Sequence, residues 1–141
     1  MTLLFCGELD MKSTLGKSSH IVVLDDEPLV AQLAASAFSE LGFENVNLFS
    51  RSEEYIQHMR QHTVDLCLLD INLNNADGLV LLGWSKAQQR QAKVVMFSGN
   101  TQKHLVEEAQ LLGAEGFLSK IDLECNLRQL LNKWNINYPL T

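Results

Sequence analysis

The sequence predicts an α/β protein built on a five-stranded parallel sheet with helices on both faces. Two observations lead to this fold class. Apolar runs of strand length alternate five times with segments whose apolar residues recur at helical spacing. The central run, residues 64–73, stays apolar almost without interruption up to Asp70, which is the pattern of a strand covered on both faces. Such alternation favours parallel strands joined by helical crossovers.

The first strand and helix are expected within residues 20–42. The segment His20–Leu24 is rich in β-branched residues and ends at an acidic stretch. Pro28 is tolerated in the first turn of a helix, and the acidic residues before it suit a helix N-terminus. Gly42 is the expected end of that helix. The apolar residues at helical spacing between these two points are Val30, Leu33, Ala34, Ala37, Phe38 and Leu41.

Four further units follow without an internal linker. We expect Ser50 or Ser52 to cap the second helix and Asp122 to cap the last. The fourth helix is predicted over residues 101–112, with Leu105, Ala109 and Leu112 on its apolar stripe. The remaining strands are predicted at residues 45–49, at the central run ending at residue 70, at 93–97 and at 116–119, with the third helix at 78–90 and the fifth at 122–134.

Two histidines, His58 and His62, lie four residues apart on the second predicted helix. This spacing can hold a metal ion. Because the sequence offers no third ligand nearby, we expect the pair to lie on a solvated helix face, where such polar side chains are usually found.

The composition limits the classes of function. The 141 residues fit one domain, 46% of them are hydrophobic, and the net charge is −6. Because nucleic-acid phosphates require a basic surface, we expect no direct nucleic acid binding. No apolar stretch approaches the roughly 20 residues of a membrane span, so no membrane association is expected. The expected partners are proteins or a cation.

The cysteines and the chain ends complete the predicted organisation. Cys6, Cys67 and Cys125 form neither a CxxC motif nor a paired framework, so a reducing cytoplasm is the expected location. We expect residues 1–18 to form a loosely held, flexible N-terminal extension, residues 19–136 the domain, and residues 137–141 a C-terminal tail.

Chemically useful side chains follow four of the five predicted strands. They are Asp25 and Asp26, Asp70, Ser98 and Lys120. Because the carboxyl ends of parallel strands open on one edge of a sheet, these residues are expected to share a pocket. Crowded carboxylates repel each other unless a cation intervenes, and Mg²⁺ takes carboxylates while leaving room for phosphate oxygens. The set therefore favours a phosphoryl-group site with an aspartate as acceptor.

This ordered set resembles the receiver domain of bacterial two-component response regulators, over residues 20 to about 134. The resemblance implies a flavodoxin-like, doubly wound sheet with strand order 2-1-3-4-5. It implies that Asp70 is the phosphoacceptor, that Ser98 and Lys120 contact the phosphoryl oxygens, and that Phe117 is an aromatic whose rotamer reports phosphorylation. It also implies a Mg²⁺ ion held by Asp26 and Asp70 directly, by Asp25 largely through water, and by the backbone carbonyl of Asn72.

The implied function is signal transduction. The domain would take a phosphoryl group from a phosphohistidine on a sensor histidine kinase or a histidine phosphotransfer protein. It would promote its own phosphorylation and dephosphorylation without being an enzyme in the ordinary sense. Its output would be contact with a downstream protein, through the surface formed by the fourth helix, the fifth strand and the fifth helix. Whether the chain is a stand-alone receiver or was cut from a longer regulator stays open.

Two positions depart from the family pattern. Asn74 stands where the family usually has a proline, so we expect a more mobile loop there. Ile121 follows Lys120 where the family commonly has a cis proline. Because a cis bond before isoleucine would cost roughly 3–4 kcal/mol, we expect a trans bond and a reshaped turn.

Two rival functions are kept. A phosphatase of the haloacid dehalogenase type also uses a strand-end aspartate and Mg²⁺, but it requires a second carboxylate two residues after the nucleophile as acid and base. Asn72 occupies that position, and an amide does not shuttle protons. The other rival is a receiver-like interaction module that is never phosphorylated, and the departures at Asn74 and Ile121 keep it open.

Overall fold

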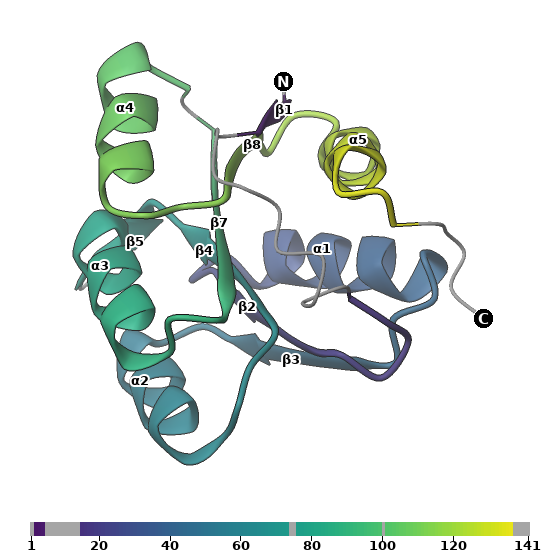
Figure 1. Ribbon diagram of the computed structural model, residues 1–141, viewed down its shortest axis with the longest axis horizontal. Helices are drawn as coiled ribbons and strands as arrows, with labels where there is room; N and C mark the ends of the chain where they lie inside the picture. The colour runs from purple at the N-terminus through teal and green to yellow at the C-terminus, as the bar shows by residue number, and fades with distance from the viewer. Residues whose placement is uncertain (1, 5–14, 74–75, 100, 137–141) are drawn as a thin grey trace.

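The computed structural model describes residues 2–4, 15–73, 76–99 and 101–136. A sheet of six strands forms its centre, in the order β1-β8-β7-β4-β2-β3 (Figure 1). The strands are β1 (Thr2–Leu4), β2 (His20–Leu24), β3 (Asn45–Phe49), β4 (Leu66–Asp70), β7 (Lys93–Ser98) and β8 (Gly116–Ser119). A short antiparallel ribbon of β5 (Asn72–Leu73) and β6 (Ala76–Asp77) follows β4.

Five of the six strands are parallel. Their order, β3-β2-β4-β7-β8, is the predicted order 2-1-3-4-5 when the parallel strands are counted along the chain. Strand β4 lies in the middle, pairs with β2 and β7, and has every residue buried. A strand buried on both faces needs apolar side chains in both directions, which explains its continuous apolar run.

The sixth strand is an addition that the sequence did not predict. Strand β1 pairs antiparallel with β8, with Leu3 opposite Phe117. Residues 1–18 were expected to be a loosely held extension, so the pairing of Thr2–Leu4 differs from that expectation. Residues 5–14 and 137–141, which include most of that extension and the predicted tail, lie outside the described residues. Strand β1 covers a hydrogen-bonding edge that β8 would otherwise leave open.

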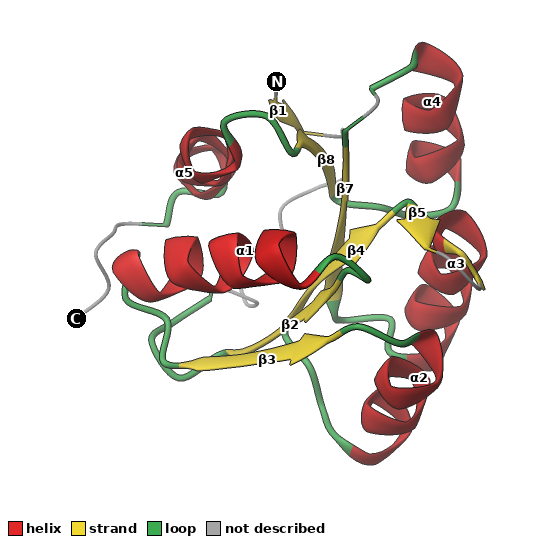
Figure 2. Ribbon diagram, turned by 180° about the vertical axis from the view of Figure 1, so that it is seen from behind, coloured by secondary structure: helices red, strands yellow, loops and turns green. Residues whose placement is uncertain are grey.

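Helices cover both faces of the sheet, as predicted. One face carries α1 (Pro28–Glu40) and α5 (Leu123–Lys133), and the other carries α2 (Ser52–Gln61), α3 (Gly78–Gln88) and α4 (Lys103–Leu111) (Figure 2). Each face has its own apolar core, one centred on residues such as Phe38 and Leu130 and the other on Tyr55 and Leu82. Of the helices in the described ranges, none has both the length and the apolar character that crossing a membrane requires.

Two predicted apolar stripes are narrower than expected. In α1, Ala34, Ala37 and Phe38 are buried, but Leu33 is 66% exposed. One residue turns about 100° around a helix, so Leu33 lies beside the buried stripe instead of within it. Leu112 lies outside α4, as the C-cap residue that follows it, and is 42% exposed.

Helix starts also differ from the prediction. Helix α2 begins at Ser52 with Arg51 in the N-cap position and no side-chain cap, so neither Ser50 nor Ser52 caps it. Asp122 occupies the predicted N-cap position of α5 in a left-handed conformation (φ 56°), but its side chain makes no cap bond. The side-chain cap that does form was not predicted: Asp77 accepts a hydrogen bond from the Leu79 N–H at 2.9 Å, at the start of α3.

Candidate functional site

Four strand ends bring the predicted side chains to one edge of the sheet. Asp70 is the last residue of β4, Ser98 is the last residue of β7, and Lys120 directly follows β8. Asp25 directly follows β2, the partner of β4. Asp25 and Ser98 are fully buried, and Asp70 is 2% exposed. The parallel pairing thus gathers residues that are far apart in the sequence, as expected.

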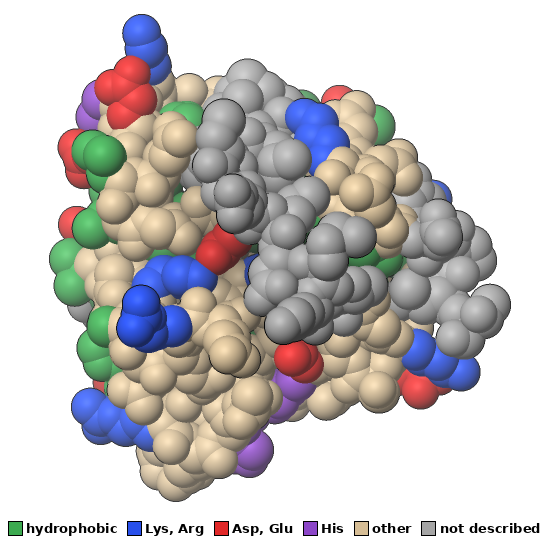
Figure 3. All heavy atoms as spheres, in the orientation of Figure 1, with side chains coloured by type: hydrophobic (Ala, Val, Ile, Leu, Met, Phe, Trp, Pro, Cys, Tyr) green, Lys and Arg blue, Asp and Glu red, His purple; other side chains and the backbone are tan. Residues whose placement is uncertain are grey.

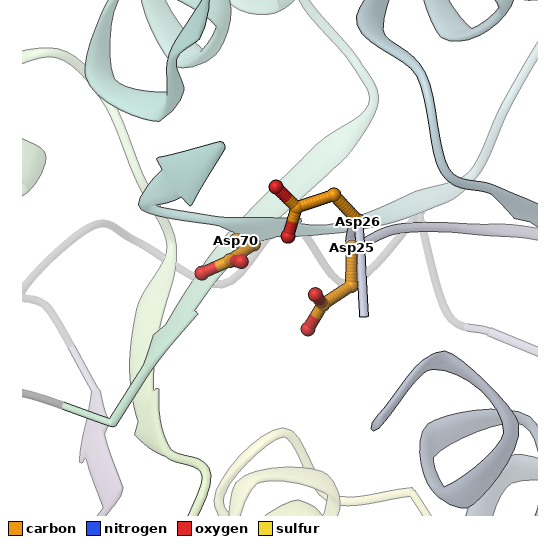
Figure 4. A group of neighbouring side chains, drawn as sticks. All are labelled: Asp25, Asp26 and Asp70. Carbon is orange, nitrogen blue, oxygen red and sulfur yellow. The ribbon is translucent and has the colours of Figure 1, made fainter. Parts of the chain in front are cut away.

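Three carboxyl groups form the centre of this edge, and we call Asp25, Asp26 and Asp70 the acid cluster. Each contributes an oxygen, and these oxygens lie within 4.8 Å of one another. Figure 4 shows Asp25 and Asp26 leaving consecutive positions of the chain, with Asp70 on the neighbouring strand. Like charges this close repel unless a proton or a cation lies among them.

The ammonium group of Lys120 lies between two members of the acid cluster. Its Nζ atom is 2.9 Å from Asp25 Oδ2 and 3.1 Å from Asp70 Oδ2. It also lies 5.0 Å from the centre of the Phe97 ring, which is a cation–π distance. The backbone N–H of Lys120 donates to the Ser98 carbonyl at 2.9 Å, which fixes where the side chain starts. One positive charge offsets only part of the charge of three carboxylates.

The electrostatics of the site follow from burial and from this crowding. Burial, together with the charge of Asp25, raises the pKa of Asp70 to about 6, and Lys120 limits the rise. Burial by itself lowers the pKa of Lys120, but its interactions with Asp25 and Asp70 outweigh burial and raise that pKa. Lys120 therefore stays protonated, whereas Asp70 holds its proton more tightly than an ordinary aspartate.

The donor set fits a hard divalent cation. Asp25 Oδ1 accepts a hydrogen bond from the Glu27 N–H at 2.8 Å. Asp25 Oδ2 is buried, and its partner is the ammonium group of Lys120, whose Nζ atom lies 2.9 Å away. Mg²⁺ binds one or two carboxylates, keeps several waters and leaves room for phosphate oxygens. Three clustered carboxylates with a single ammonium group beside them therefore suit such an ion.

Asn72 lies close to the acid cluster through its backbone. Its N–H donates to Asp70 Oδ1 at 3.2 Å, and its side chain is exposed. The contact orients the Asp70 carboxylate. The expected role of the Asn72 carbonyl as a metal ligand stays a prediction, and Asn74 lies outside the described residues.

Gly78, which the sequence analysis did not single out, is required by the close approach of α3 to β4. A Cβ atom at this position would lie 2.3 Å from the Asp70 carbonyl oxygen and 2.6 Å from Ile71 Cα. The Gly78 N–H donates to the Ile71 carbonyl at 3.0 Å. A larger residue would push the helix away from the strand end that carries Asp70. The sequence holds no local signal for this requirement, because the close approach arises only when the helix packs on the strand end.

Phe117, the expected switch aromatic, is fully buried in β8 and belongs to the core beneath α2, α3 and α4. It pairs with Met96 in β7, two residues before Ser98. Its switching role stays a prediction, because a core aromatic of ordinary packing function would lie in the same way.

The turn after Lys120 is held by side chains. The Ile121 N–H donates to Ser119 Oγ at 3.1 Å. The buried amide of Asn126 donates to the carbonyls of Ser119 and Ile121 at 3.1 and 2.9 Å. Asn126, another residue that the sequence analysis missed, thereby ties α5 to the segment that carries Lys120. The expected trans bond before Ile121 stays a prediction.

Known proteins are similar to this chain in sequence. The chemotaxis protein CheY of Bacillus subtilis is 26% identical over 114 residues, covering 81% of this chain and 95% of CheY. The transcriptional regulatory protein MalR of the same species is 26% identical over 102 residues, covering 72% of this chain and 43% of MalR. Several curated relatives are matched over only about half of their own length, between 43% and 53%.

A solved structure shows the same fold. The crystal structure of a response regulator protein from Burkholderia pseudomallei, with a phosphorylated aspartic acid, calcium ion and citrate, matches with a TM-score of 0.73 at 21% identity. That match covers 84% of this chain and 69% of the other.

The family model described as the response regulator receiver domain matches residues 21–133. That range runs from β2 to the end of α5 and includes the acid cluster and Lys120. It covers well over half of the chain. This protein therefore belongs to the response regulator receiver domain family.

Proposed function

We propose that the chain is a phosphoacceptor: Asp70 takes a phosphoryl group from a phosphohistidine in a two-component phosphorelay, in a reaction that depends on Mg²⁺. The observation that carries the proposal is the position of Asp70. Its carboxylate lies at a strand end, beside two further carboxylates and within 3.1 Å of a lysine ammonium. Receiver domains are generally phosphoacceptors and not enzymes, which agrees with this reading.

In the proposed reaction, an oxygen of Asp70 attacks phosphorus, the bond between phosphorus and the donor imidazole nitrogen breaks, and that nitrogen takes a proton. Phosphoryl transfer asks a protein mainly for positioning and charge neutralisation. The Asn72 N–H holds one Asp70 oxygen, and Lys120 would pair with the incoming phosphoryl oxygens. Bound Mg²⁺, held by the acid cluster and the Asn72 carbonyl, would neutralise the charge on these oxygens.

The proposed output is a shift of the surface formed by α4, β8 and α5. Ser98 ends β7 next to the phosphoacceptor strand, and its carbonyl is bonded to the Lys120 N–H. A new phosphoryl group on Asp70 would draw the Ser98 hydroxyl and Lys120 toward its oxygens. Both residues belong to the segments that lead into α4 and α5, so a local charge change would bias these elements. A downstream protein would read the change by contact.

The surface beside the acid cluster supports a protein donor. Leu29 and Leu33 of α1 are 76% and 66% exposed. A groove of about 610 Å³ between α1 and α5 is lined by Leu33, Ala37, Leu123 and Lys120, among others. Exposed apolar side chains next to a site often mark a protein contact. The proposed donor is a sensor histidine kinase or a histidine phosphotransfer protein.

A mass measurement tests phosphorylation directly. The protein is incubated with acetyl phosphate and Mg²⁺, and its intact mass is recorded. The expected result is the gain of one phosphoryl group in the wild type and none in Asp70→Asn. Asp122→Asn, an exposed aspartate just beyond Lys120, is the matched control and should gain the group normally. Folded wild-type protein that gains no mass would contradict the proposal.

A second experiment separates donor contact from chemistry. Leu33→Glu should slow transfer from a phosphorylated histidine phosphotransfer protein, yet leave labelling by acetyl phosphate unchanged. Leu111→Glu, at an 86% exposed leucine of α4 on the opposite face, is the control. If Leu33→Glu receives the phosphoryl group from the donor protein as fast as Leu111→Glu does, Leu33 does not contact the donor.

The unphosphorylated interaction module remains the second candidate, and one observation favours it. Lys120 already pairs with both Asp25 and Asp70, so an internal cation satisfies part of the site. The mass measurement distinguishes the two, because the silent module would stay unmodified while folded.

A further inference from the structure

Three of the four histidines in the chain meet at the edge of the sheet opposite the acid cluster. His20 opens β2, whose other end leads to Asp25, while His58 lies in the last turns of α2 and His62 is the C-cap of that helix. Figure 3 shows histidine side chains, coloured purple, at the surface of the molecule. We call His20, His58 and His62 the histidine cluster. A strand therefore supplies the third histidine that the sequence did not reveal.

The contacts within the cluster place two ring nitrogens close together. His20 Nε2 and His58 Nε2 are 3.0 Å apart, and the side-chain amide of Asn47 lies 2.9 Å from the same His20 Nε2 atom. An amide nitrogen only donates, so His20 Nε2 is the acceptor in both contacts and His58 Nε2 carries the shared proton. A metal ion at His20 Nε2 would therefore displace the Asn47 contact as well as the shared proton.

That spacing is close to what a metal ion requires. Zinc binds imidazole nitrogens at about 2.0–2.1 Å in tetrahedral geometry, which places two ligand nitrogens roughly 3.3 Å apart. The observed separation is a few tenths of an ångström shorter. A zinc ion could take the place of the shared proton after a small opening of the pair, without any change of strand register.

His62 lies beside this pair, but its ring must turn to complete the set, because no choice of one nitrogen from each of the three histidines brings them within 4.8 Å of one another. Its ring stacks on His58 with centroids 4.2 Å apart, and its centroid is 6.2 Å from that of His20. Its Nδ1 atom lies 3.2 Å from the His58 carbonyl oxygen. Donation to a backbone carbonyl is the usual arrangement of the second nitrogen of a ligating histidine, and it leaves Nε2 unprotonated. His62 is exposed, so its ring can turn toward His20 without disturbing the core.

We propose that His20, His58 and His62 form a binding site for a zinc ion, with water as the fourth ligand. Neutral imidazoles suit zinc and its transition-metal neighbours, whereas Mg²⁺ prefers oxygen. The two ends of the sheet would therefore select different cations. Asp65 adds a negative charge beside the site, since its Oδ2 atom accepts from the His20 N–H at 2.7 Å. Bound zinc would fasten the end of α2 to the start of β2.

Calorimetric titration with zinc tests the site in the folded protein. Saturating Mg²⁺ is present to fill the acid cluster, and Cys6→Ser with Cys125→Ser removes two thiols that could bind zinc. One zinc ion per chain is expected. His20→Gln and His58→Gln should each weaken binding at least about tenfold, since even loss of an outer-shell partner costs that much. His104→Gln, at the exposed histidine of α4, should change nothing.

The site has two direct contradictions. Zinc affinity that survives His58→Gln unchanged would overturn the proposal, as would affinity that Asp70→Asn abolishes, because the acid cluster would then be the zinc site. Imidazole NMR of the wild type gives an answer that needs no variant. Zinc should shift the signals of three histidines and leave the fourth, and a titration that moves none of them refutes the site.

Discussion

Replacing Asp70 by asparagine should stabilise the protein when no divalent cation is present. The wild type must keep a carboxylate in a buried position beside two others, which costs free energy in the folded state. The raised pKa of Asp70 reports this cost. Asparagine has nearly the same shape as the protonated acid and carries no charge, so the variant avoids the cost. The same substitution removes the proposed phosphoacceptor, so stability and phosphorylation should change in opposite directions.

The magnitude follows from the pKa. Burial and the charge of Asp25 raise the pKa of Asp70 from 3.8 to about 6. At about 1.4 kcal/mol per pKa unit, a rise of roughly two units corresponds to about 3 kcal/mol. This figure already includes the ion pair with Lys120, which limits the rise in the pKa of Asp70. The expected gain in the free energy of unfolding is therefore at most about 3 kcal/mol at pH 7.5.

The pH dependence has a definite sign. Between pH 3.8 and about 6 the folded wild type binds more protons at Asp70 than the unfolded chain, so its stability falls as the pH rises through this window. Above that window the loss is complete. The advantage of Asp70→Asn should therefore be largest at pH 7.5 and should shrink toward pH 4. Mg²⁺ should reduce it at pH 7.5, because the ion stabilises the wild-type carboxylates.

The assay is guanidinium unfolding in EDTA at pH 4 and pH 7.5, followed by the fluorescence of the two tryptophans. Asp122→Asn is the control, because this residue is exposed and asparagine tolerates its left-handed conformation. It should change stability by less than about 0.5 kcal/mol. The reasoning would be refuted if Asp70→Asn were no more stable than the wild type at pH 7.5. It would also be refuted if the difference in the free energy of unfolding between the two proteins were the same at pH 4 and pH 7.5.

Three further predictions concern the supports of the site, each measured by the same unfolding assay at pH 7.5. Gly78→Ala should lower the free energy of unfolding by about 1–3 kcal/mol, because the added methyl group would overlap backbone atoms. Gly83→Ala in the same helix has room for the methyl group and should raise the free energy of unfolding by about 0.5–1 kcal/mol, so similar values for the two variants would contradict this prediction. Asn126→Ala should lower the free energy of unfolding by about 1–3 kcal/mol, because the carbonyls of Ser119 and Ile121 lose their donor. Asn132→Ala, at an exposed position of the same helix, is the control and should have little effect. Lys120→Met should lower the free energy of unfolding by about 3 kcal/mol in EDTA, because Asp25 and Asp70 lose their cation. Mg²⁺ should restore part of this stability, and a loss that Mg²⁺ does not change would show that Lys120 does not act by neutralising these carboxylates.

Much of the architecture was predictable because each element repeats a local pattern. Strand β4 has an apolar run that only a strand buried on both faces can use. The strand order was reached through the family resemblance, and the acidic turn after β2 and the lysine after β8 carried that resemblance. The acid cluster was predicted for a general reason: parallel strands must end on one edge, so residues at those ends meet.

Other features had no local signal. The pairing of Thr2–Leu4 with β8 depends on an edge formed more than a hundred residues later. The need for glycine at position 78 comes from the carbonyl of Asp70, which approaches through the fold. Each of these is a contact between segments, and no periodicity within one segment encodes it.

The sequence alone determined which chemical groups stand at the strand ends, because their order along the chain and the alternation of strands and helices are written in it. Only the tertiary structure decided how those groups balance one another: Lys120 lies between Asp25 and Asp70, and burial raises the pKa of Asp70. It also decided that His20 joins His58 and His62. The physical reason is that electrostatic and coordinating interactions depend on distances through space, which are fixed when the helices pack on the sheet.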